Sequence, residues 1–246
     1  MKIVFVTLSS LTIRAGQEKV LSTVANRLKA DYSCDVRILS LPLAGVELRK
    51  EMLEDFRSFE VYRASDFRDI NHYRMKMVIA TLLSKQFLAN YRSMETYLEN
   101  LRETDIFVVL DPLLLTTTSE FVRKNNLKAK VVYWDHAGIQ YYLRETQSLR
   151  EKVKHAIPAR LVREGILRAD AFLAISSGIA RIIKSIKPDA NITMVYNPLP
   201  KYEGRLVDRP KNGGAVFLYV GRLEDRQKNI TFMLKGLAKL KKKVGS

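Results

Sequence analysis

Short apolar runs alternate with amphipathic stretches along the chain, and this alternation predicts a parallel α/β fold. Residues 2–8 (KIVFVTL) form a continuous apolar run, which is typical of a strand buried on both faces of a parallel sheet. A polar loop follows, and residues 19–29 then place their apolar side chains at helical spacing. A second strand is predicted at residues 35–39, so the three segments should form a right-handed strand–helix–strand crossover.

The pattern continues to residue 195 and predicts one doubly wound, Rossmann-like parallel sheet. Further strands are predicted at residues 59–62, 106–110, 130–133, 171–175 and 192–195. Helices are predicted through residues 120–125 and from 149 to 169, and Pro158 must kink or break the second one. Residues 71–101 carry apolar side chains at spacings of three and four, which favours a long core-facing helix over a helix on a membrane surface.

A change in the pattern divides the chain near residue 200. The segment NPLP at 197–200 ends the regular alternation, and the polar stretch 201–214 is typical of a linker. A new apolar run at 215–220 and a helical pattern at 229–242 follow. One strand and one helix do not make a sheet. We therefore expect residues 1–200 to form an N-terminal Rossmann-like domain and 215–246 to be one βα unit at the start of a second, truncated one.

Charge is the strongest anomaly of the composition. The chain has 42 Lys and Arg against 26 Asp and Glu, a formal net charge of +16. A field of this sign attracts nucleotide phosphates, anionic lipid surfaces or nucleic acid. Nucleic-acid binding is disfavoured because the sequence has no helix-turn-helix, no RNP-like segment and no basic stripe interleaved with aromatic residues.

Cysteine usage and targeting signals favour a cytoplasmic protein. A single cysteine, Cys34, allows no disulfide framework and no cysteine-rich metal site, as is usual in a reducing compartment. The first residues do not follow the pattern of a signal peptide, and no stretch approaches the ~18 apolar residues of a membrane span.

Two candidate residues follow predicted strands in the first domain. Gly16 lies just before the helix predicted at 19–29, where free N–H groups and the helix dipole favour an anion such as a diphosphate, but many such glycines only turn the chain. His136 follows the strand at 130–133, at the edge where open α/β sheets bind ligands. It could contact a sugar hydroxyl or help to neutralise developing charge, or be a structural loop histidine.

A second pair of candidates follows the apolar run at 215–220. Arg222 offers a forked donor to a phosphate, and Lys228, six residues on, offers a point charge. The alternative is that both are solvated charges of a basic tail. Their place between a predicted strand and a predicted helix favours the phosphate-binding interpretation.

Three segments in order resemble the successive signatures of the family 4 glycosyltransferases, which have the GT-B fold. They are AISSGI at 174–179, VYNP at 195–198 and FLYVGRL at 217–223. The pattern is most similar to bacterial lipopolysaccharide-core and cell-envelope hexosyltransferases, including the galactosyltransferase type. The resemblance extends over nearly the whole chain, although residues 43–130 carry little of it.

The resemblance implies roles for the four candidates. Gly16 matches the second glycine of the family's Gly-Gly loop near the donor diphosphate, with Ala15 in the place of the first. His136 matches the catalytic histidine on the acceptor side of the cleft, which contacts the donor sugar. Arg222 and Lys228 match the basic pair that grips the donor diphosphate. Ser176, Ser177 and Asn197 belong to signature segments and are expected to serve architecture and hinge.

The resemblance also implies a reaction. It is the transfer of a hexose, with retention of configuration, from a nucleotide sugar that we expect to be UDP-linked to a lipopolysaccharide, lipid-linked or polysaccharide acceptor. No metal or other cofactor is expected, and the sequence has no Asp-x-Asp motif. Fixed cations would stabilise the departing diphosphate more in the transition state than in the ground state.

By the resemblance, residues 1–200 are the acceptor-side domain and residues 215–246 the truncated start of the donor-binding domain. The family's donor-reading residues and its pair of glutamates eight apart have no match in this sequence. We therefore expect little transfer by the chain alone, unless a C-terminal domain or a complementing subunit is supplied. The enzyme would be peripheral on the inner face of the plasma membrane. The alternative hypothesis is a non-catalytic basic module that binds an anionic membrane or a partner glycosyltransferase.

Overall fold

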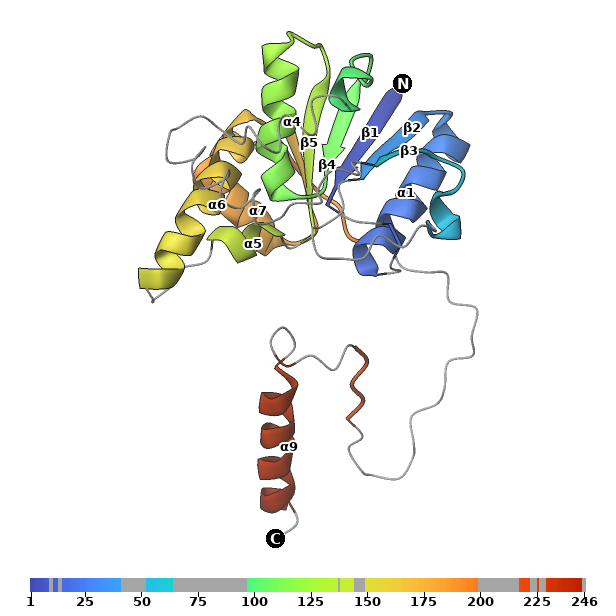
Figure 1. Cartoon of the computed structure of the whole chain (residues 1–246). Coiled ribbons are helices and arrows are strands. Elements are labelled where there is room, and N and C mark those ends of the chain that lie inside the picture. Colours follow the sequence, from blue (N-terminus) through green and yellow to red (C-terminus); the bar gives the residue numbers. More distant parts are fainter. Residues whose placement is uncertain are drawn as a thin grey trace. The chain divides into compact units, whose positions relative to one another are not determined.

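The computed structural model of the chain separates into two compact units, Met1–Pro200 and Lys201–Ser246, shown in Figure 1. It describes residues 1–8, 11–12, 15–40, 52–63, 97–136, 138–143, 149–198, 217–221, 225 and 229–244. Each unit is considered by itself. Their assignment as an acceptor-side domain and the start of a donor-binding domain stays a prediction, and the predicted linker 201–214 lies outside the described residues.

The first unit is built on seven parallel strands in the order β3-β2-β1-β4-β5-β6-β7. The strands are β1 (Lys2–Thr7), β2 (Asp35–Ser40), β3 (Glu60–Arg63), β4 (Ile106–Val109), β5 (Lys130–Asp135), β6 (Ala171–Ala174) and β7 (Ile192–Met194). The helices are α1 (Gly16–Tyr32), the short 3₁₀ turn η1 (Glu54–Phe56), α4 (Pro112–Lys124), α5 (Gly138–Leu143), α6 (Leu149–Arg168) and α7 (Ser177–Ile186). The predicted doubly wound, Rossmann-like fold is confirmed.

Strand order reverses between β1 and β4, because β2 and β3 lie on one side of β1 and the later strands lie on the other. Since all strands are parallel, their carboxyl ends share one edge of the sheet. Ligands of open α/β sheets bind outside these ends, at the reversal. The edge formed by the ends of β1, β4 and β5 is therefore the place to look for a site.

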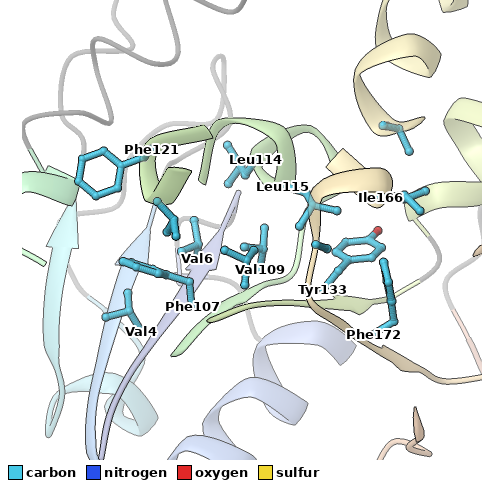
Figure 2. Close-up of a cluster of buried hydrophobic side chains, with 14 of the residues drawn as sticks. Val4, Val6, Phe107, Val109, Leu114, Leu115, Phe121, Tyr133, Ile166 and Phe172 are labelled. Atoms are coloured by element: carbon cyan, nitrogen blue, oxygen red, sulfur yellow. The ribbon is translucent and has the colours of Figure 1, made fainter. Parts of the chain in front are cut away.

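Alternating side chains of the strands feed two separate cores, one on each face of the sheet. One core joins strand residues to α1 and includes Phe5, Leu21, Val108 and Trp134. The other packs strand residues against α4, α6 and α7 (Figure 2). Its largest members, Phe107, Tyr133 and Phe172, are fully buried, and burial of each such side chain is worth about 2 kcal/mol.

Helix α4 begins earlier than the sequence pattern predicts, at Pro112. Asp111 caps it by accepting a hydrogen bond from the backbone N–H of Leu113 at 2.8 Å, and Pro112 occupies the first turn, where proline is tolerated. The threonines at 116–118 have low helix propensity, so the local sequence gives little sign of the earlier start. All three are buried, so tertiary packing decides their conformation.

Helices α4 and α6 approach each other closely at Gly165. A β-carbon there would lie 2.8 Å from Oγ1 and 3.0 Å from the backbone N of Thr116. The Thr116 hydroxyl also donates to the carbonyl of Leu161 at 2.6 Å. Helix α6 continues through Pro158 without a break in its helical assignment, so the break that was one of the two predicted outcomes does not occur.

Two further sequence predictions have different outcomes. Of the predicted helix at 71–101, residues 71–96 lie outside the described residues, and 97–99 are helical. In the second unit, α9 (Ile230–Val244) matches the predicted helix. The strand predicted at 215–220 is wrong for residues 217–220, which are not in a strand. A strand needs a neighbour for its backbone hydrogen bonds, and the described part of this unit offers none.

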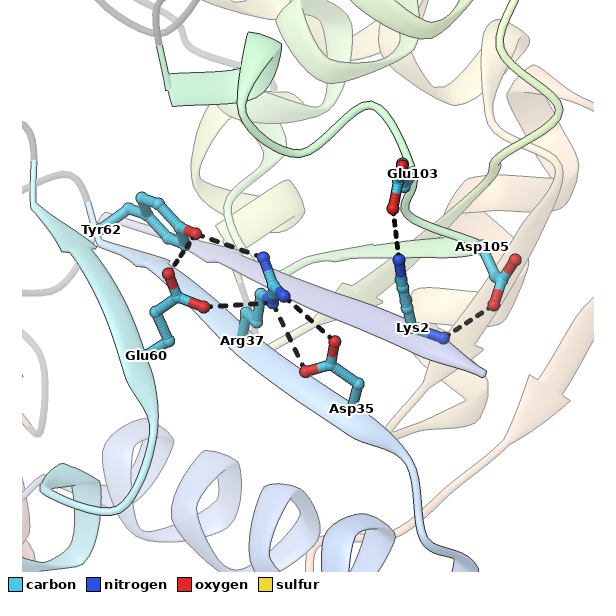
Figure 3. A network of polar contacts seen from close by, with 7 residues as sticks. All are labelled: Lys2, Asp35, Arg37, Glu60, Tyr62, Glu103 and Asp105. Atoms are coloured by element: carbon cyan, nitrogen blue, oxygen red, sulfur yellow. Dashed lines mark hydrogen bonds and ion pairs between the residues drawn. The ribbon is translucent and has the colours of Figure 1, made fainter.

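Polar contacts link the amino ends of the strands, at the opposite end of the sheet from the candidate site (Figure 3). One group of contacts joins Lys2 to Glu103 and Asp105, and a second group joins Arg37 to Asp35, Glu60 and Tyr62. Hydrogen bonding to Asp35 raises the pKa of Arg37. Most of these charges are partly exposed, so each pair adds little stability. The contacts of Lys2 tie the start of β1 to neighbouring segments, far along the strands from the candidate site.

Candidate active site at the carboxyl edge of the sheet

His136 directly follows the last residue of β5, at the carboxyl edge. Its ring lies against the buried Trp134, with 4.7 Å between ring centroids and 51° between ring planes. Trp134 belongs to the core on the α1 face. Residues two apart along a strand point to the same face, so His136 lies at the carboxyl edge on the α1 side.

Burial makes His136 an unusual histidine. It lowers the pKa of the imidazole from 6.5 to about 4, so the ring is neutral at pH 7. Its Nε2 atom is shielded from solvent and has no hydrogen-bond partner within the described chain, and the same holds for Nε1 of Trp134. Buried polar atoms in native proteins are nearly always paired. Two neighbouring rings, each with a shielded nitrogen that has no partner in the described chain, therefore mark a place where a ligand or an ordered water belongs.

Gly16 is the first residue of α1 and lies at the same edge. The residue before it, Ala15, makes no side-chain cap, and a β-carbon at Gly16 would meet no atom of the described residues within 4 Å. The Gln17 amide donates to Oγ1 of Thr7 at 3.2 Å, which ties the start of α1 to the end of β1. This arrangement, an open helix N-terminus with uncapped N–H groups, is what the predicted diphosphate contact requires.

The structure thus brings two of the four predicted site residues to one edge and one face. Gly16 follows β1 and His136 follows β5, and only β4 lies between these strands, so their ends are about 10 Å apart at the usual strand spacing. Arg222 and Lys228 lie outside the described residues. Their role in binding a diphosphate stays a prediction.

Two carboxylates, Asp135 fully buried and Asp111 partly buried, lie at the ends of neighbouring strands, and sequence reasoning did not single them out. Asp111 follows β4 and caps α4, and burial raises its pKa from 3.8 to about 6, with a further contribution from the charge of Asp135. Asp135 ends β5, is fully buried, and accepts hydrogen bonds from the Tyr133 hydroxyl at 2.5 Å and the Ile139 backbone N–H at 3.0 Å. An aspartate at the end of a buried strand was the only signal available in the sequence.

One residue of the signature segment at 174–179 has a structural role in this fold. Ser176 caps α7, because its Oγ accepts a hydrogen bond from the Ile179 backbone N–H at 3.3 Å. Asn197 is exposed beyond β7, and its hinge role stays a prediction. No cluster of three or more His, Cys, Asp or Glu that could hold a metal ion occurs in the part of the chain that the structure describes.

Comparisons with known proteins show what the whole chain is similar to. No protein-family model matches the chain. Over 157 residues it is 29% identical to the lipopolysaccharide 1,6-galactosyltransferase of Salmonella typhimurium, a match that covers 62% of this chain and 39% of that protein. The chain resembles a glycosyltransferase.

Solved structures show the same fold. The lipopolysaccharide outer core galactosyltransferase WaaB in its apo form matches 97% of this chain and 57% of its own, with a TM-score of 0.67 and 22% identity. Sucrose-phosphate synthase from Thermosynechococcus elongatus matches 79% of this chain and 47% of its own, with a TM-score of 0.51 and 10% identity. The chain spans less than three fifths of each of these proteins.

Proposed function

We propose that this chain is the acceptor-side part of a retaining family 4 glycosyltransferase that transfers galactose from a UDP sugar to a lipopolysaccharide or related lipid-linked or polysaccharide acceptor. The observation that supports this most is the 29% identity with a lipopolysaccharide 1,6-galactosyltransferase. The carboxyl edge adds physical support, since it combines the N-terminus of α1 with a neutral imidazole whose Nε2 has no partner among the described residues.

In this proposal the donor diphosphate lies at the N-terminus of α1, beside Gly16, where backbone N–H groups and the helix dipole favour negative charge. Arg222 and Lys228 would supply the remaining positive charge. As the bond from the sugar to the diphosphate breaks, charge grows on the leaving oxygen, and cations fixed beforehand stabilise that charge. The acceptor hydroxyl forms the new glycosidic bond, and its proton leaves with the diphosphate.

His136 acts through a hydrogen bond rather than through charge. With a pKa of about 4, its ring is neutral at any physiological pH. Nε2, which has no partner in the described chain, would pair with a hydroxyl of the donor sugar. A site built to pair a buried group discriminates strongly against ligands that leave it unpaired. His136 is therefore the residue on which both sugar orientation and sugar choice should depend.

The test is UDP-galactose turnover with a galactose-deficient lipopolysaccharide acceptor. Since the chain spans 39% of its Salmonella relative, the remaining C-terminal part of that relative is added as a separately expressed domain. We expect transfer that requires both components, with the anomeric configuration of the donor retained in the product. No transfer and no nucleotide binding with or without the added domain would contradict the proposal.

A second candidate function, an anionic-membrane-binding module, is favoured by one helix. The last turn of α9 carries Lys241, Lys242 and Lys243, and Phe232 and Leu234 are exposed on the same helix. Basic residues near apolar ones suit a membrane interface. No helix in the described residues is long and apolar enough to cross a membrane. Tight binding to anionic vesicles without any nucleotide-sugar turnover would favour this function over the transferase.

A further inference from the structure

The turn that carries His136 is held from inside the protein by one carboxylate. Asp135 is fully buried at the end of β5. Its Oδ1 atom accepts the Ile139 backbone N–H at 3.0 Å, so the side chain bridges the turn and binds the first turn of α5. The same oxygen accepts the Tyr133 hydroxyl at 2.5 Å. The two bonds fix the carboxylate both to its own strand and to the helix that follows.

The other side of this turn is held by close packing. A β-carbon at Gly138 would lie 2.9 Å from Cδ and 3.2 Å from Cγ of Pro112, the first residue of α4. Helix α5 in turn packs against α6 and α7. Asp135 and Gly138, on either side of His136, are therefore held by a hydrogen bond and by close packing, although Nε2 of His136 has no hydrogen-bond partner in the described chain.

We propose that Asp135 is the positioning residue of the site, and that its carboxylate, by bridging the turn to Ile139 and Tyr133, holds the His136 ring against Trp134. Asp135 and His136 are adjacent, so their side chains leave the strand on opposite faces. Asp135 points into the core formed with α4 and α6, whereas His136 points to the α1 side. The carboxylate thus acts on the imidazole through the backbone of the turn.

The buried position of the ring supports this reasoning. His136 has its low pKa because burial disfavours the charged form. If the turn loosens, the ring gains access to water and its pKa returns toward 6.5. The catalytic consequence of the proposal rests on the proposed function, but the position of the ring can be measured without any transfer reaction.

The chain carries its own probe for this measurement. Trp134 is its single tryptophan and touches the His136 ring, and a protonated imidazole in contact with an indole quenches its fluorescence. Fluorescence of the full chain is followed from pH 5 to pH 8, with circular dichroism to confirm that the fold persists. For the unaltered chain we expect no transition from His136 in this range, and titration of Asp111 near pH 6 is common to all the variants compared. For Asp135→Ala we expect a fluorescence transition whose midpoint is shifted from about pH 4 toward pH 6.5.

Three variants make the result specific. Asp135→Asn keeps a side-chain oxygen that can accept both hydrogen bonds, so it should behave like the unaltered chain. The double variant Asp135→Ala with His136→Asn should lose the new transition, which assigns it to His136. Ser176→Ala removes a similar cap from the neighbouring α7 and should leave the fluorescence profile unchanged, although it destabilises the fold.

A folded Asp135→Ala variant without a transition between pH 5 and pH 8 would overturn the proposal. If Asp135→Ala does not fold, Tyr133→Phe decides, because it removes one hydroxyl from the bridge and no other atom. We expect this variant to move the transition upward into the measured range, and an unchanged profile would contradict the proposal.

In the complemented transfer assay, Asp135→Ala should lower kcat by up to about 100-fold, the usual effect of a misplaced group, and change KM for UDP-galactose much less. Failure of that assay in the unaltered chain counts against the proposed function alone.

Discussion

Asp111 and His136 should make stability depend on pH in opposite directions. Burial raises the pKa of Asp111 from 3.8 to about 6, so the folded state holds its proton more tightly than the unfolded state. Its contribution to stability is full below pH 3.8 and is lost as the pH rises through 6. Burial lowers the pKa of His136 from 6.5 to about 4. Its contribution is full above pH 6.5 and is lost as the pH falls through 4.

The sizes of the two effects follow from these values. One pKa unit corresponds to about 1.4 kcal/mol, so Asp111 costs the folded state about 3 kcal/mol at neutral pH. Replacing it with Asn removes the titration but keeps a side-chain oxygen for the Leu113 backbone N–H, and Asn is as good a helix cap as Asp. We expect the unfolding free energy of Asp111→Asn, relative to the unaltered chain, to rise by about 3 kcal/mol between pH 3.5 and pH 6.5.

The assay is urea unfolding at a series of fixed pH values, followed by circular dichroism, with the variant and the unaltered chain measured side by side. Taking the difference removes the contributions of all other carboxylates, which the two proteins share. His136→Asn serves as the counterpart, because its stability relative to the unaltered chain should fall by about 3 kcal/mol as the pH rises from 4 to 6.5. A difference for Asp111→Asn that stays constant within about 1 kcal/mol across this range would refute the reasoning.

Three further predictions concern stability and binding. Gly165→Ala places a β-carbon 3.0 Å from the backbone N of Thr116. This variant should lower the free energy of unfolding by about 1–3 kcal/mol, as measured by urea unfolding. An unaltered urea midpoint of unfolding would show that α4 and α6 separate easily. The new β-carbon of Gly16→Ala meets no atom of the described residues within 4 Å, so the free energy of unfolding should change by less than about 1 kcal/mol. If the diphosphate lies beside Gly16, the affinity of the complemented protein for UDP-galactose, measured by calorimetry, should fall. An unchanged affinity would remove Gly16 from the site. Ser176→Ala removes the cap of α7 and should cost about 1 kcal/mol in thermal or urea unfolding, and no loss of stability would show that the cap contributes nothing.

The sheet could be predicted from the sequence because its strands are marked by local composition. The run at residues 2–8 and the run at 106–110 became β1 and β4 with boundaries correct to about two residues. The start of α4 was missed because it depends on burial of Thr116 and its neighbours against α6, which no local pattern records. The same holds for α5, whose first turn is stabilised by Asp135 from within the core.

For a related reason, two residues of the candidate site could be singled out from the sequence, whereas their packing could not. His136 and Gly16 could be found because each follows a strand in the chain, and the carboxyl edge collects such residues. The bridge made by Asp135 and the contact of the ring with Trp134 depend on which face of β5 each side chain takes and on what packs there. The local sequence predicts that successive side chains of a strand alternate between its two faces, but it does not predict which residues each side chain contacts.

The central claim is that the carboxyl edge around His136 is where the sugar is transferred. The measurement that tests it most directly compares His136→Ala with Ser176→Ala in the complemented UDP-galactose transfer assay, after both variants are shown to be folded. The account predicts that His136→Ala loses about 100-fold or more in kcat/KM, as expected for removal of a group that stabilises the transition state, while Ser176→Ala keeps most of its activity. Equal activity of the two variants would contradict the account and place the reacting sugar elsewhere.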